Sequence, residues 1–83
     1  MITQYIQAAL QHARYEMIED EEPYYGEIEP LKGVWATGKT LEQCRDKLAE
    51  VLDGWILVRL NRRMAIPPID GVEITVPREL NVA

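Results

Sequence analysis

The sequence predicts an α+β fold in which a three-stranded antiparallel meander and a fourth strand carry a long amphipathic helix on one face. A short N-terminal helix precedes this core. Three observations predict the fold. Short β-prone segments succeed one another between residues 14 and 37, separated by charged, proline and glycine turns. A segment with helical spacing of its apolar residues begins at Leu41, and residues 72–76 then alternate strictly between apolar and polar.

The chain has 83 residues, enough for one small domain, which we assign to residues 1–83. Its first segment, residues 2–13, predicts a helix because apolar residues recur along one face. These residues are Ile2, Ile6, Ala9, Leu10 and Ala13. His12, the single histidine, lies off this stripe, so we interpret it as a solvated surface residue.

The core is predicted to span about residues 14–76. Residues 14–19 alternate well enough for a strand, and a charged loop that ends in a proline stops it. Residues 24–28 predict the second strand and residues 34–37 the third. Short strands that follow one another through tight turns pair as antiparallel neighbours, which gives the meander.

The third strand runs directly into the start of the long helix. Gly33 and Gly38 bracket the strand, and each can take a positive φ without a Cβ penalty. Thr40 is a favourable N-cap residue, and Gln43 follows it at the spacing of a capping box. Local chemistry alone therefore predicts a strand-to-helix turn here.

The helix is predicted from Leu41 to about Asn61. Its inner stripe consists of Leu41, Cys44, Leu48, Val51, Leu52 and Trp55. Gly54 interrupts it at a cost of about 1 kcal/mol relative to alanine, which we explain by close packing beside Trp55.

The length of this helix predicts an oligomer. It would be about 30 Å long, whereas strands of five or six residues span about 17–20 Å, so its last turns should overhang the sheet. Those turns are apolar around more than one face, which favours burial by a second subunit in a homodimer or higher oligomer. The expected oligomer-interface residues are Ile56, Leu57, Val58 and Leu60.

Composition narrows the function classes. The net charge is −5, which disfavours a nucleic-acid-binding surface and favours a basic protein partner. One cysteine permits no intrachain disulfide and fits a reducing cytoplasm. We find no signal peptide and no apolar run long enough to span a bilayer, so we expect a cytoplasmic protein.

The chain offers little for catalysis. Cys44 falls on the inner face of the helix, where a buried thiol behaves as a small hydrophobe. The consecutive acidic residues 20–22 lack the alternating spacing of a calcium loop. We therefore expect no enzyme, no catalytic or metal-binding residue and no cofactor. Tyr25 and Trp35 lie on short strands where one face must be exposed or covered, so we predict them as partner-interface residues.

The order of these motifs resembles the HicB-like antitoxin family. Its domain carries a Leu-x-Gly turn, a short strand, a Gly-x-Thr-Leu helix start, a late tryptophan and an Ile-Pro tail. The corresponding residues, with the capping residue Gln43, are Leu31, Gly33, Gly38, Thr40, Trp55, Ile66 and Pro67. The resemblance covers about residues 14–76 and implies a β-β-β-α-β core, described as a partial ribonuclease H-like fold.

The resemblance also implies a function. HicB-like antitoxins of prokaryotic toxin–antitoxin systems bind a small basic HicA-type toxin, an RNA-cleaving protein, and block its active site by protein–protein contact. The net charge of −5 suits such a partner. Full-length members usually add a C-terminal DNA-binding module. Here only residues 78–83 follow the fourth strand and Pro77, so we do not expect operator binding.

Two alternatives stay open. The first is a stand-alone oligomeric interaction module without a toxin partner. The second is a residual metal-dependent nuclease, because true nucleases of the ribonuclease H fold place carboxylates on elements that here carry Glu16, Glu42 and Glu73. Outward glutamates on an acidic protein also serve solubility, and HicB-like domains lack the nuclease constellation, so we rank the nuclease last.

Overall fold

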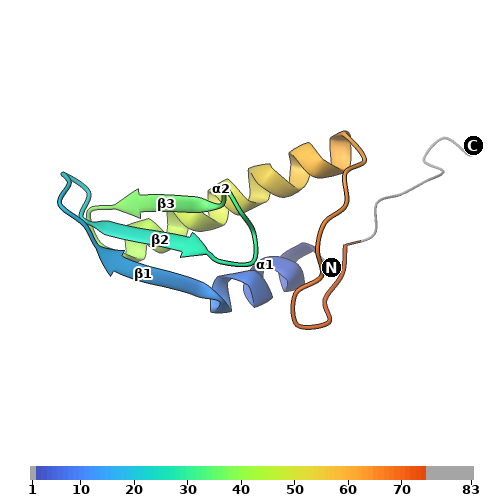
Figure 1. Cartoon of the computed structure of the whole chain (residues 1–83), viewed down its shortest axis with the longest axis horizontal. Helices are drawn as coiled ribbons and strands as arrows, with labels where there is room; N and C mark the ends of the chain where they lie inside the picture. Colours follow the sequence, from blue (N-terminus) through green and yellow to red (C-terminus); the bar gives the residue numbers. More distant parts are fainter. Residues whose placement is uncertain (1, 75–83) are drawn as a thin grey trace, which may run out of the picture.

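The computed structural model describes residues 2–74 of the chain as a small sheet with two helices (Figure 1). The long helix runs along one face of the sheet, and the short helix lies next to the start of the first strand. The elements in chain order are α1 (Ile2–Gln11), β1 (Ala13–Met17), β2 (Tyr24–Ile28), β3 (Trp35–Gly38) and α2 (Leu41–Asn61).

The sheet is the predicted three-stranded antiparallel meander, with strand order β1-β2-β3. Tyr15 pairs with Gly26, which in turn pairs with Ala36. A Cβ at position 26 would lie 2.8 Å from the Tyr15 ring and 3.1 Å from the Cys44 sulfur, so only glycine lets the ring lie across β2. The face that carries Tyr15 and Ala36 is therefore the face covered by α2.

Helix α2 has the predicted bounds and a capped start. Thr40 is the N-cap, and its side-chain oxygen accepts a hydrogen bond of 3.1 Å from the backbone N–H of Gln43. This is one half of the predicted capping box; no reciprocal bond from the Gln43 side chain occurs among the described residues.

The buried stripe of α2 differs from the predicted one. Its fully buried members recur every four residues: Cys44, Leu48, Leu52 and Ile56. Leu41 and Val51 are instead 49% and 38% exposed, and Trp55 is half-buried. A row of residues at i+4 rotates around a helix by about 40° per step. The buried face of α2 therefore turns gradually from the sheet toward α1.

The end of α2 that overhangs the sheet is covered on one side within the chain. Tyr5 and Ala9 of α1 are fully buried, and the Tyr5 hydroxyl donates a hydrogen bond to the carbonyl oxygen of Pro67. Ile66 is 8% exposed in the same core cluster. The expected oligomer-interface residue Ile56 belongs to this core, with no exposed area, so its assignment to a subunit interface is wrong. Among the other residues of that set, Leu57 and Val58 are exposed and Leu60 is half-buried.

The predicted fourth strand over residues 72–76 is not seen in its described part, residues 72–74. Val72 forms an isolated antiparallel bridge to Ile69 across a turn in which Asp70 and Gly71 have positive φ. Two side chains are buried at this end, Ile69 and Ile74, and they fill the core beside α1 instead of a place in the sheet. Residues 75 and 76 lie outside the described part of the chain.

We predict that Gly38→Ala destabilises the protein by about 1–3 kcal/mol, because the new Cβ would overpack the strand–helix junction. That Cβ would lie 2.4 Å from the backbone nitrogen of Cys44 and 2.8 Å from its Cα, atoms that cannot rotate away. Urea unfolding measures the loss. Gly54→Ala is the matched control: apart from its chain neighbours and the adjacent backbone of the same helix, no atom lies within 4 Å of its new Cβ, so stability should not fall. Equal stability of Gly38→Ala and the unchanged protein would contradict the prediction.

Candidate functional site

The face of the sheet opposite α2 carries the candidate site, which we call the open face. Its residues alternate with those that face α2, two from each strand. They are Arg14, Glu16, Tyr25, Glu27, Trp35 and Thr37. Helix α2 packs against β3 and β2 from the other side, and Figure 1 shows α2 behind the sheet. The open face is thus an unpartnered sheet surface with mixed aromatic and charged side chains.

Two aromatic rings form the centre of the open face. Tyr25 and Trp35 stack with ring centroids 6.0 Å apart and an angle of 27° between their planes. Trp35 remains 54% exposed. Stacking fixes both rings before any partner arrives, which lowers the entropy lost on binding. The predicted partner-interface residues therefore lie together, with Trp35 exposed and Tyr25 half-buried.

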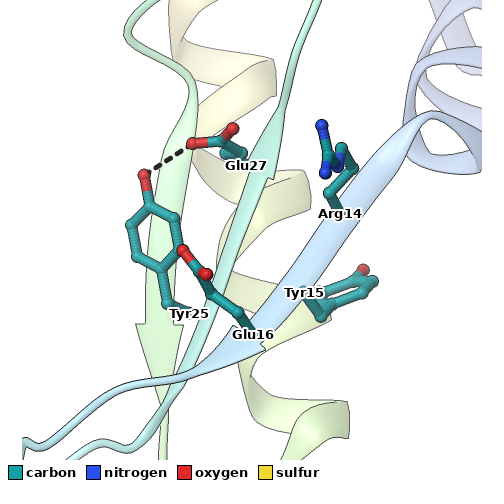
Figure 2. Close-up of a pocket in the computed structure, with 5 residues that line it drawn as sticks. All are labelled: Arg14, Tyr15, Glu16, Tyr25 and Glu27. Carbon is teal, nitrogen blue, oxygen red and sulfur yellow. Dashed lines mark hydrogen bonds between the residues drawn. The ribbon is translucent and has the colours of Figure 1, made fainter.

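Carboxylates surround these rings. The Tyr25 hydroxyl donates a hydrogen bond of 2.9 Å to Glu27 Oε1 (Figure 2), and this bond, with the carboxylate charge, raises the pKa of Tyr25. Glu16 is the direct cross-strand neighbour of Tyr25. Arg14 lines the same hollow but pairs with Glu29 at 3.1 Å. The open face thus presents two carboxylates beside the stacked pair of aromatic rings.

A third carboxylate, Glu22, joins three segments at the edge of the site. Its Oε1 accepts a hydrogen bond of 2.6 Å from the Thr37 hydroxyl, and Lys47 of α2 lies 3.0 Å from its Oε2. The bond from Thr37, then that from Lys47, lowers the pKa of Glu22. The loop between β1 and β2 is therefore tied to both β3 and α2. The sequence analysis placed Glu22 only in a charged loop, because nothing in a linear pattern shows partners 15 and 25 residues away.

The residues of the nuclease alternative do not converge. Glu16 lies on the open face, Glu42 is exposed in the first turn of α2 on the opposite side of the sheet, and Glu73 is exposed beyond the core. No group of three metal-ligating side chains occurs among residues 2–74. These three glutamates therefore lie too far apart on the fold to bind one metal ion together.

His12 and Cys44, the two residues considered for acid–base or thiol chemistry, both make contacts that stabilise the fold. His12 is exposed, and its Nε2 lies 2.9 Å from Asp70 Oδ1, a contact that holds the turn after Ile69 beside the end of α1. Cys44 has no exposed area, and burial raises the pKa of its thiol. Its Sγ donates to the Ala36 carbonyl oxygen at 3.5 Å.

The motif residues serve the fold. Leu31 is 2% exposed, and Gly33 has a φ of 89° in the turn before β3. Trp55 is half-buried, and the Arg59 guanidinium lies over its ring, 4.4 Å from the ring centroid. None of these side chains belongs to the open face.

No helix in the described part of the chain is long and apolar enough to cross a membrane.

Comparison with known proteins gives a family and a similar structure. The sequence model of a family described as UPF0150-like matches residues 4–67. A crystal structure of TTHA0281 from Thermus thermophilus is 51% identical, with a TM-score of 0.84 over 88% of this chain and 96% of that one. The search of curated proteins found no significant match.

We predict that Glu22→Gln lowers stability at neutral pH and that this loss fades on acidification. A folded-state pKa below the ordinary value means that the carboxylate stabilises the fold above the ordinary glutamate range. That contribution disappears as the pH falls through the lowered pKa. Urea unfolding between pH 7 and about pH 3 measures the difference between variant and unchanged protein. Glu21→Gln, a change at the neighbouring exposed glutamate, is the control; a pH-independent loss for Glu22→Gln would refute the assignment.

Proposed function

The chain belongs to the UPF0150-like family, and on this premise we propose that it is a HicB-like antitoxin domain. In this proposal it binds a small, basic, RNA-cleaving protein of the HicA type and neutralises it by direct contact. The match to the family model covers most of the region that carries the HicB-like motifs, including Gly38, Thr40 and Trp55.

The stacked Tyr25–Trp35 pair, with Trp35 exposed and carboxylates beside it, is the observation that carries the proposal. Tryptophan and tyrosine are the residue types that most often anchor protein interfaces. Carboxylates beside an aromatic face attract arginine and lysine, since the cation gains both an ion pair and a cation–π contact. The open face therefore suits a basic protein surface better than an acidic or apolar one.

Such a contact would also explain inhibition. An RNA-cleaving protein must hold phosphates with basic side chains and often stacks bases on planar groups. Glu16 and Glu27 offer carboxylates to those basic side chains, and Trp35 offers a ring for stacking. A partner held in this way would have its RNA-binding groups occupied.

The overall charge supports fast association with a basic partner. The net charge of −5 on 83 residues steers a cationic protein toward this one before contact. Salt should therefore slow association of the proposed complex more than it speeds dissociation.

We predict that Trp35→Ala weakens the complex by about 30-fold or more, the size expected for loss of a tryptophan hot spot. The probe is the product of a short basic reading frame adjacent to the gene, co-expressed with this chain. Co-purification detects the complex, and calorimetry measures its affinity. Glu27→Lys should weaken it further, through repulsion of the basic partner.

Met17→Ala is the matched control, because Met17 is 64% exposed but belongs to the α2 side of β1. It should bind normally. Absence of any complex with the unchanged chain would contradict the antitoxin proposal and favour a stand-alone interaction module. Binding that survives both Trp35→Ala and Glu27→Lys would show that the partner binds another surface.

A further inference from the structure

The outer edge of β3 has no strand beside it in the described part of the chain, because the strand order is β1-β2-β3. The backbone N–H of Ile28 donates to the carbonyl oxygen of Val34 at 3.0 Å, so that carbonyl points toward β2. In an antiparallel pair the direction of the backbone groups alternates from residue to residue, and Ala36, opposite Gly26, also faces β2. The N–H and C=O groups of the residues on either side of Ala36 therefore point outward from the sheet.

These outward backbone groups belong to Trp35 and Thr37, and they border a groove between β3 and α2. Helix α2 forms one wall of the groove, because it packs against β3 from the covered side of the sheet (Figure 1). The groove has a volume of about 530 Å³, and we call it the β3 edge groove. Its lining residues are Gly33, Trp35, Ala36, Thr37, Lys47, Glu50 and Val51. A free strand edge beside a groove is the geometry that accepts an extended peptide as an additional strand.

The α2 wall of this groove is apolar with an acidic rim. Val51 is 38% exposed and supplies the apolar contact. The cation of Lys47 pairs with Glu22 at 3.0 Å, which compensates its charge. Glu50 is exposed and makes no ion pair with any residue that the structure describes. Charge complementarity therefore favours a basic segment over an acidic one in this groove.

Strand geometry fixes where the side chains of such a segment would lie. Residues that bond to Trp35 and Thr37 would project their side chains onto the open face, and the residue between them would project toward α2. Glu27 is the cross-strand neighbour of Trp35 on its other side. A lysine or arginine opposite Trp35 would therefore lie beside the exposed indole ring, in the row that continues to Glu27. An apolar residue opposite Ala36 would lie toward Val51.

We propose that the basic partner of this protein binds by adding one extended segment to the outer edge of β3, as an antiparallel strand. The segment carries a lysine or arginine on the open face and, at the next position, an apolar residue on the α2 side. This binding mode rests on the proposed function and deepens it, because it states how the partner reaches Trp35. One strand would contact both the open face and the β3 edge groove.

Amide hydrogen exchange of the unchanged chain, followed by NMR with and without the co-expressed basic partner, tests this binding mode. The outward amides of Trp35 and Thr37 should exchange rapidly in the free chain. In the complex both should slow by about tenfold or more, because each donates a hydrogen bond to the added strand. Tyr15 supplies the control amide: the bond from Ile18 N–H to the Pro23 carbonyl oxygen, by the same alternation, turns it outward on β1. Its exchange should not change.

Thr37→Pro removes one outward donor and should weaken the complex by about tenfold or more. Proline is tolerated in an edge strand where its nitrogen faces solvent, and urea unfolding checks the fold of the variant. Thr37→Val is the matched control, because it loses the hydroxyl bond to Glu22 but keeps the backbone N–H. It should bind normally.

Val51→Lys should also weaken the complex by about tenfold or more, through loss of the apolar contact and repulsion of the basic segment. Val58→Lys is its matched control on the same helix. Val58 is 49% exposed and does not line the β3 edge groove, so the variant should bind normally. Both side chains are exposed, so neither change threatens the fold, and this pair decides the question if Thr37→Pro fails to fold.

A complex in which the Trp35 and Thr37 amides exchange as fast as in the free chain would overturn this binding mode and leave the proposed function standing. Slower exchange at Tyr15 alone would also overturn it, by placing the segment on β1. Protection of the Trp35 and Thr37 amides that rises with the concentration of the free chain would assign the edge to a second copy and overturn the basic segment. Absence of any complex would overturn both the binding mode and the proposed function.

Discussion

The close approach of β3 to the first turn of α2 is the constraint on which the rest of the structure depends. At Gly38 the strand lies so near the backbone of Cys44 that any side chain would separate them. Thr40 caps the helix two residues later, so the direction of α2 is set within a few residues of the strand end. With that direction fixed, the buried row from Cys44 to Ile56 first covers the sheet and then meets α1. The direction of α2 therefore determines which face of the sheet is covered and which face stays open.

This arrangement places two different surfaces on opposite sides of the sheet. The open face lies on one side, and the exposed side of α2, which carries Val51 and Val58, lies on the other. Their charges also differ, since carboxylates surround Tyr25 whereas Arg59 and Arg62 lie at the C-terminal end of α2.

Local chemistry and periodicity predicted most of the fold. The bounds of α2, its N-cap and the strand meander follow from residues close together in the chain, such as Thr40 and Gln43. Contacts between residues that are far apart in the chain could not be predicted in this way. The sequence contains no sign that Ile56 would pack beneath α1, that Val72 would bridge back to Ile69, or that Glu22 would join Thr37 and Lys47. In the candidate site, the strand pattern predicted that Tyr25 and Trp35 lie on a face that is exposed or covered by a partner, but not that their rings stack.

The single cysteine, Cys44, can report local opening of the folded protein. Cys44 of α2 is buried against β3, where its Sγ donates to the Ala36 carbonyl oxygen. Burial raises the pKa of its thiol. A thiol reagent can reach the sulfur only when the β3–α2 contact separates, because the thiolate is the reactive form and needs solvent. The labelling rate under native conditions therefore reports the free energy of opening at the strand–helix junction. Since Ala36 lies between Trp35 and Thr37 in β3, the same rate would sense whether occupation of the open face tightens the strand beneath it.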